Sequence, residues 1–198
     1  MPLPTFDRAD ETLDYAAQQL SRAVADPKHP WHWPVLATAG PAARVVVLRS
    51  FTRSTSRVVF YTDARSAKVG QLAGAGGACE LLFYHYKHRT QLRISGVAAA
   101  STDDDERRRL WDRQSDQGRR SYATSAPPGT PLDGPGDGLP PGFTQQPTEQ
   151  QLARAFENFA VFTLDVRRAD FLQLGREGQR RCRWGGDWSL EGFGWVTP

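Results

Sequence analysis

Polar and cationic side chains recur on or just after the apolar runs between residues 44 and 93. They are Arg44, Arg49, Tyr61, Thr62, Ser66, Lys68, Gln91 and Arg93. Cations on rigid elements can hold a phosphate, and each charge-assisted hydrogen bond contributes roughly 1.5 to 3 kcal/mol. Taken singly, each of these residues is more often only a charge at the end of a strand. Their order along the chain is therefore the informative feature.

Several other chemistries lack their signatures in this sequence. There is no GxxxxGK[ST] phosphate loop, no GxSxG nucleophile turn and no HExxH zinc helix. Gly74, Gly76 and Gly77 follow a helical segment and precede a strand, the reverse of a dinucleotide-binding fingerprint. We interpret these glycines as the end of a helix. Hydrolase, nucleoside-triphosphatase and Rossmann functions are therefore disfavoured.

A metal site is also disfavoured. His85 and His88 are three residues apart on chain that we expect to be extended, which would point them to opposite faces. Cys79 and Cys182 form neither a CxxC pair nor a dense framework, so we expect them to be reduced and packed.

The charge balance is compatible with an anionic ligand but does not indicate nucleic acid. The net charge is +3, and the arginines at 107–109 follow four acidic residues without interleaved aromatic residues. The N-terminal residues lack the pattern of a signal peptide, and no apolar run approaches the length of a membrane span. We expect a cytoplasmic protein without a nucleic-acid or membrane partner.

The elements that would position the polar residues are mostly strands. Apolar residues at helical spacing predict a helix over 9–26, and β-branched and aromatic runs predict strands at 35–38, 44–51, 57–63, 78–86 and 89–100. Helical segments are expected at 66–74, 102–114 and 148–158, a strand with a bend near Arg168 at 159–174, and a final hairpin turning at Gly185 and Gly186. The pattern predicts a mainly β (α+β) fold, an antiparallel barrel with flanking helices.

One domain spanning residues 1–198 is expected from the length of the chain. Residues 126–142 are rich in proline and glycine and almost free of apolar residues, which predicts a mobile loop near the site.

Four blocks of sequence resemble successive FMN-binding strands of the pyridoxamine 5′-phosphate oxidase-like family. They are RVVVLR at 44–49, FYTDARSAK at 60–68, ELLFYHY at 80–86 and RTQLRISG at 89–96. The resemblance covers residues 35 to about 100 well and the C-terminal hairpin more loosely. It implies a split β-barrel with FMN bound at the interface of a homodimer.

The resemblance also implies roles for individual residues. Arg44 would contact the FMN phosphate or ribityl chain, with the backbone around Val47 and Leu48 along the flavin. Thr62, Ser66 and Lys68 would complete the phosphate site, beside Tyr61. Gln91 would hydrogen-bond the flavin ring, Arg181 would approach it, and Arg49 occupies a family lysine position where it would meet an anionic substrate.

The substrate residues of the oxidase match less well. The substrate-binding arginine and histidine correspond to Glu177 and Gln179, and the spaced tyrosine, arginine and serine have only Trp111, Ser115 and Arg119 nearby. The flavin-side tryptophan corresponds to Phe171 or Leu172, and an arginine of the phosphate site has become Ala67, with Arg65 as a replacement. The positions expected to bind the cofactor therefore match the family better than the positions expected to bind the substrate.

The expected function is an FMN-dependent oxidoreductase acting on an unknown small molecule, because FMN carries the redox chemistry while the protein binds and orients it. Two alternatives stay open: a flavin-binding module without catalysis, and a split barrel that binds deazaflavin or haem. The sequence does not identify a catalytic residue.

Overall fold

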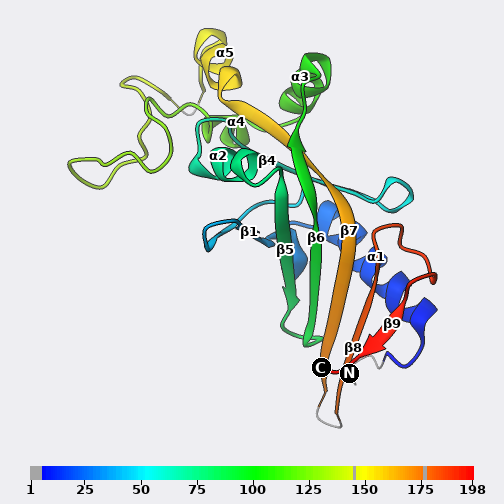
Figure 1. The fold of residues 1–198 in the computed structure, drawn as a ribbon. Helices are drawn as coiled ribbons and strands as arrows, with labels where there is room; N and C mark the ends of the chain where they lie inside the picture. The colour runs from blue at the N-terminus through cyan, green and yellow to red at the C-terminus, as the bar shows by residue number, and fades with distance from the viewer. Residues whose placement is uncertain (1–5, 145, 176–177) are drawn as a thin grey trace.

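Strands dominate the structure, a computed structural model that describes residues 6–144, 146–175 and 178–198 (Figure 1). The helices are α1 (Ala9–Ala25), α2 (Ala67–Gly74), α3 (Asp104–Asp112), α4 (Asp116–Arg120) and α5 (Glu149–Glu157). The strands are β1 (Val35–Thr38), β2 (Ala42–Val45), β3 (Ser50–Thr52), β4 (Arg57–Asp63), β5 (Ala78–His85), β6 (Thr90–Ala100), β7 (Phe159–Gly175), β8 (Gly178–Gly185) and β9 (Gly194–Val196). Short 3₁₀ turns cover Pro30–His32 and Arg53–Thr55.

The strands form one antiparallel sheet in the order β2-β1-β5-β6-β7-β4-β3, with β8 paired to β7 and β9 paired to β8. The long strand β7 pairs with β4 along its first part and with β8 along its second (Figure 1). It therefore belongs to two partly separate halves of the sheet. The prediction of a mainly β, antiparallel split barrel with flanking helices is confirmed.

A β-bulge in β7 separates these two halves. Ser95 pairs with Arg168 and Gly96 pairs with Val166, so Arg167 is the extra residue. A Cβ at Gly96 would lie 2.1 Å from the Asp165 carbonyl oxygen, which explains the glycine at this crossing. The bend expected near Arg168 is therefore present.

The single strand predicted over residues 44–51 is wrong in one respect: the chain forms β2 and β3 with a linking segment between them. In this segment the partners of the backbone change. Val46 and Leu48 donate to the carbonyls of Pro34 and His32, whereas Arg49 donates to Val59 on β4. The segment thus crosses from one side of the barrel to the other.

The C-terminal hairpin also differs from the prediction. The chain does turn after Gly185, but the returning strand is β9, so residues 187–190 are not part of a strand. Helix α4 was not predicted from the sequence. Residues 126–142 contain no helix or strand, as expected of a loop, and extend to one side of the molecule (Figure 1).

Two hydrophobic clusters hold these elements together. The larger one lies between α1 and the sheet, where Leu13, Leu20 and Trp31 pack with strand residues such as Leu81. The smaller one joins α3, α5 and the start of β7 around Trp111, with Tyr122 and Phe159 beside it. No helix in the described ranges is both long and apolar enough to span a bilayer.

Candidate functional site

The clearest group of anion-binding side chains lies where β4 leads into α2. Lys68 Nζ, in the first turn of α2, donates to Thr62 Oγ1 at 2.9 Å and to Ser66 Oγ at 2.6 Å. Both hydroxyl residues are buried. Ser66 is also the N-cap residue of α2, so the free backbone N–H groups of this helix begin beside the lysine.

Arg44 on β2 forms the second half of this group. Its guanidinium donates to Thr38 Oγ1 at 2.7 Å and to Gln71 Oε1 at 2.6 Å, and Thr38 Oγ1 also donates to Gln71 at 2.8 Å. Sequence reasoning missed Thr38 and Gln71. The position of Gln71, three residues after Lys68 on one helix, is a spacing that could have indicated it. We call the set Thr38, Arg44, Thr62, Ser66, Lys68 and Gln71 the cradle.

The cradle carries two cations without a bridging carboxylate among the described residues. Burial lowers the pKa of Lys68, and the positive charge of Arg44 lowers it further, whereas Asp63 opposes the shift. Asp63 is itself paired with Arg65, at 2.8 Å. An anion bound between Arg44 and Lys68 would relieve their repulsion and use the N-terminus of α2.

The linking segment between β2 and β3 leaves part of its backbone open. Within the described residues, the N–H groups of Val46, Leu48 and Arg49 have backbone partners, but that of Val47 has none. Leu48 is buried in the main core, whereas Val47 is partly exposed. The segment can therefore present peptide groups to a ligand at Val47.

Arg49 and Tyr61 form a separate pair. The Arg49 guanidinium carbon lies 5.1 Å from the centre of the Tyr61 ring. Tyr61 and Thr62 are consecutive in β4, so their side chains point to opposite faces of the strand. The structure thus places these two predicted site residues across β4 from the cradle.

Gln91 and Arg181 lie on the face of the sheet opposite Arg44. Gln91 pairs with Leu172, which in turn pairs with Arg181, so the three side chains share one face. Val45 pairs with Val35, which pairs with Leu82. Leu82 pairs with Arg93, and Arg93 shares the face of Gln91 because the two are two residues apart on β6. Val45 therefore lies on the face of Gln91, and Arg44 points to the other. One chain does not bring all the predicted flavin residues together.

Arg181 belongs to an ionic cluster around Asp170. The buried carboxylate accepts from Arg181 through both oxygens at 3.0 Å, from Arg93 at 2.9 Å and from Arg183 at 2.6 Å. Burial alone would raise the pKa of Asp170, but the hydrogen bonds from Arg181, Arg183 and Arg93 lower it to about 2. The cluster fixes the orientation of Arg181.

The structure also places the positions where the resemblance departs from the oxidase. Phe171 is buried among Phe6 and Tyr15, so Leu172 is the residue that lies between Gln91 and Arg181. Arg65 donates to Asp63 and Thr124 and takes no part in the cradle.

The corresponding substrate positions are dispersed. Trp111 is in the smaller core, and Arg119 donates to backbone carbonyls. Ser115 lines a cavity with Arg49, and Gln179 is exposed on β8. Glu177 lies outside the described residues.

The expectation that His85 and His88 point apart is wrong. Their rings stack with centroids 3.9 Å apart and planes 5° from parallel, because β5 ends at His85 and the chain turns before β6. Arg89 adopts a positive φ of 52° in this turn. Across the described chain no group of three or more ligand side chains could hold a metal ion.

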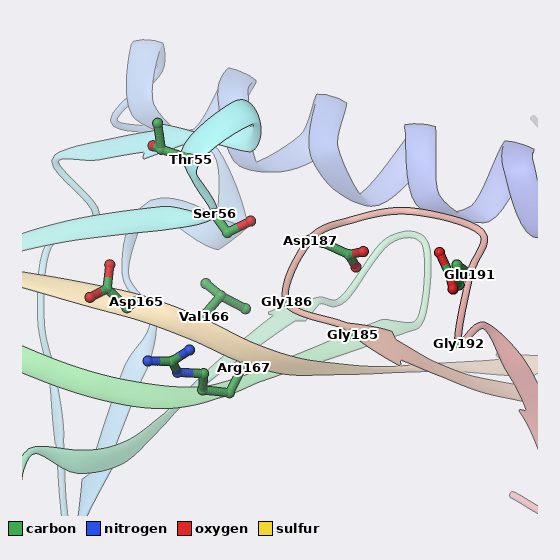
Figure 2. A pocket seen from close by; sticks show the side chains of 10 residues that line it. All are labelled: Thr55, Ser56, Asp165, Val166, Arg167, Gly185, Gly186, Asp187, Glu191 and Gly192. Atoms are coloured by element: carbon green, nitrogen blue, oxygen red, sulfur yellow. The ribbon is translucent and has the colours of Figure 1, made fainter.

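Another cavity, of about 600 Å³, lies at the bulge of β7. Figure 2 shows Asp165 and Arg167 on β7 and Asp187 and Glu191 on the loop after β8 around it. None of the predicted site residues lines this cavity. Its lining has three carboxylates and one arginine, and Asp165 is paired with Arg57 at 3.0 Å. The cradle has two cations and no carboxylate, so it is the better site for a phosphate.

Residues 16–102 match the family model described as pyridoxamine 5′-phosphate oxidase, FMN-binding domain. The match includes the whole cradle. No curated protein matches the chain.

Two solved structures share the fold over essentially their whole length. A pyridoxamine 5′-phosphate oxidase-related, FMN binding protein from Nostoc punctiforme is 24% identical, with 100% of both chains covered and a TM-score of 0.68. PhzG from Burkholderia lata, in complex with tetrahydrophenazine-1-carboxylic acid, is 18% identical, with 98% of both chains covered and a TM-score of 0.71. The family match and the common fold confirm the resemblance: residues 16–102 match the FMN-binding domain model of pyridoxamine 5′-phosphate oxidase, and the whole chain shares the split-barrel fold of these two structures.

Proposed function

We propose that this protein binds FMN as a homodimer and uses it to oxidise or reduce a small molecule. The observation that carries the proposal is the cradle, where Lys68 and Arg44 are joined to buried hydroxyl groups without a neutralising carboxylate among the described residues. A phosphate monoester supplies the acceptor oxygens that these donors need. The family match to an FMN-binding domain supports the choice of FMN.

Each residue then has a role toward the cofactor. Lys68, Arg44 and the hydroxyls of Thr62 and Ser66 would hold the phosphate, and the open peptide group at Val47 would lie along the flavin. FMN supplies the capacity to accept or deliver electrons, while the chain binds and orients the reactants.

The two faces of the sheet support the proposed homodimer. Gln91 and Arg181 face away from the cradle of their own chain, so we infer that they act on the FMN held by the cradle of a second copy. In a two-fold dimer both sites are then built from both chains.

Mixing two inactive variants tests this arrangement. Lys68→Ala and Gln91→Leu chains should each bind FMN weakly as homodimers. Random reassociation makes half of the dimers mixed, and one of the two sites in each mixed dimer is intact, so about a quarter of the sites recover wild-type affinity. Absence of recovery after the chains have exchanged would refute the shared site.

A module that carries flavin without catalysis is the second candidate. The dispersal of Trp111, Ser115 and Arg119, together with the exposed Gln179, favours it, because these positions do not form the oxidase substrate site. Reduction of the bound flavin by a nicotinamide donor, or turnover of pyridoxamine 5′-phosphate, would decide against this candidate.

The decisive experiment for both candidates is the identity of the copurifying ligand. The absorption spectrum and native mass of the full chain should show FMN. Colourless protein that cannot be reconstituted with FMN would refute the proposal, and a bound deazaflavin or haem would replace it with one of those ligands.

A further inference from the structure

All four histidines of the chain lie at one corner of the fold. Here α1 packs against the 3₁₀ turn at Pro30–His32, and both meet the turn between β5 and β6. Three of the rings form a row, in which the His29 ring lies 5.5 Å from the His85 ring and the His85 ring stacks on His88. We call the following residues the histidine corner: Tyr15, Gln19, His29, His32, His85 and His88.

Two rings of the row accept hydrogen bonds from backbone N–H groups. Nδ1 of His29 accepts from Trp31 at 3.1 Å. Nδ1 of His85 accepts from His88 at 3.2 Å. A ring nitrogen that accepts a hydrogen bond cannot also carry a proton. The 3₁₀ turn and the turn after β5 are therefore both closed by neutral histidine, and protonation of Nδ1 breaks each closure.

The surroundings of the row disfavour a positive charge. Burial is the main cause that lowers the pKa of all three rings, and that of His85 falls to about 4. Among the described residues, the other charges that act on the row are Arg22, Lys87 and Asp26. Arg22 and Lys87 oppose protonation, and Asp26 favours it at His29 alone. Two charged rings stacked 3.9 Å apart would also repel each other.

The other titratable groups of the corner do not oppose this behaviour. The Tyr15 hydroxyl lies 2.7 Å from Nδ1 of His88, and burial raises the pKa of Tyr15, so the hydroxyl stays neutral. His32 donates through Nδ1 to the carbonyl of Ala23 at 2.6 Å. A protonated His32 keeps this donor. Protons therefore act on the corner through the row and not through His32.

The corner supports two segments that the proposed flavin site uses. The His32 carbonyl accepts from the N–H of Leu48 at 3.0 Å, in the linking segment between β2 and β3. The turn after His85 leads into β6, whose second residue is Gln91. Opening the two turns would loosen both segments.

We propose that the histidine corner is a proton-operated latch. Its neutral rings hold the 3₁₀ turn and the turn between β5 and β6 closed, and uptake of protons opens the corner while the strands remain paired. Opening also speeds the release of FMN. This consequence rests on the proposed flavin function, whereas the latch itself does not.

The expected size of the effect follows from one ring in its two states. In the open corner His85 takes up a proton with the ordinary histidine pKa of about 6.5, whereas in the closed corner it does so only near pH 4. Between pH 7 and pH 5 the equilibrium constant for opening should therefore rise about twentyfold from His85 alone. The other two rings of the row add to this rise, because their pKa values are also lowered.

Hydrogen exchange, followed by NMR on the full chain without FMN, tests the latch. Exchange rates are compared with those of unstructured peptides at the same pH, which gives the protection of each amide. The amides of Trp31 and His88 should lose about twentyfold or more of their protection between pH 7 and pH 5. At pH 5 they should also be about tenfold or more less protected than the paired amides of β4 and β7. Equal protection of the corner and these strands would overturn the proposal, because the corner would then open only when the whole chain unfolds.

Variants assign the effect to the histidines. His85→Asn keeps an acceptor for the His88 N–H but does not titrate, so its loss of protection should be about twentyfold smaller than in the wild type. His29→Asn does the same for the 3₁₀ turn and is a second variant if the first is unstable. Tyr84→Phe, an exposed change beside His85, is the control and should respond as the wild type does. A wild-type response in both asparagine variants would show that the histidines do not operate a latch.

The release of FMN from the loaded protein tests the consequence. The release rate, measured by flavin fluorescence after dilution, should rise between pH 7 and pH 5 by a factor about twentyfold larger in the wild type than in His85→Asn. A phosphate monoester takes up its second proton near pH 6, and this contribution cancels between the two proteins. An equal rise in both would refute the coupling to flavin. If the chain binds no FMN but its corner responds to pH as expected, the latch stands and only the proposed flavin function and its consequence are lost.

Discussion

The buried histidine pair makes a quantitative prediction about acid stability. His85 is 6% exposed, its ring stacks on that of His88, and its Nδ1 accepts the His88 backbone N–H at 3.2 Å. A proton at Nδ1 would break this hydrogen bond. Burial lowers the pKa of His85 to about 4, with the positive charge of nearby His88 and His29 contributing.

The sign follows from comparing the two states. Well above pH 6.5, His85 is neutral in both the folded and the unfolded chain, so its titration does not change the free energy of unfolding. As the pH falls below 6.5 the unfolded chain takes up the proton, and the folded chain does so only near pH 4. The titration of His85 should therefore lower the free energy of unfolding by about 2 kcal/mol between pH 7 and pH 5. This corresponds to a fall of about 4–8 °C in the thermal midpoint.

The assay is urea unfolding of wild type and His85→Phe at pH 7 and at pH 5. Phenylalanine keeps a buried ring but does not titrate, so the stability lost on acidification should shrink by about 2 kcal/mol in the variant. Tyr84→Phe, an exposed change at the preceding position, should lose as much stability as the wild type. An equal loss in wild type and His85→Phe would refute the reasoning.

Three further changes probe the site and the sheet. Lys68→Ala should weaken FMN binding at least tenfold, or about 1.4 kcal/mol, whereas exposed Lys28→Ala should not; an unchanged dissociation constant by flavin fluorescence would show that another cation holds the phosphate. Asp170→Asn should lower the free energy of unfolding by about 2 kcal/mol at pH 7, because the three arginines lose their carboxylate, and the wild type should lose this contribution only as the pH falls below 3.8 toward 2. Gly96→Ala should cost about 2 kcal/mol or more in urea unfolding, since its methyl group would overlap the Asp165 carbonyl; wild-type stability would mean that the bulge relaxes freely.

Features that depend on residues close together in the sequence could be predicted. The strands at 35–38 and 57–63 have the predicted bounds, because short β-branched and aromatic runs there are closed by turn residues. Thr62, Ser66 and Lys68 meet because a strand end, a turn and a first helical turn bring them together within seven residues.

Features that depend on contacts between residues far apart in the sequence could not be predicted. The strand predicted at 44–51 divides because its backbone bonds to residues 32 and 34 on one side and to residue 59 on the other. Gln71 joins Arg44 and Thr38 only after α2 packs beside β1. The alternation rule does not apply to His85 and His88, because β5 ends at His85 and residues 86–89 form a turn.

The long strand β7 bears on the proposed shared FMN site, because it separates the two groups of residues that would bind the flavin. Its first part pairs with β4, which leads into the cradle, and its second part pairs with β8, which carries Arg181. A continuous strand fixes the distance between the two groups, and the alternation of side chains keeps Arg181 and the cradle on opposite faces. No rotation of side chains can bring them to one ligand. If both groups bind one FMN, as proposed, they must come from two different copies of the chain, which is the arrangement that the mixing of Lys68→Ala and Gln91→Leu chains tests.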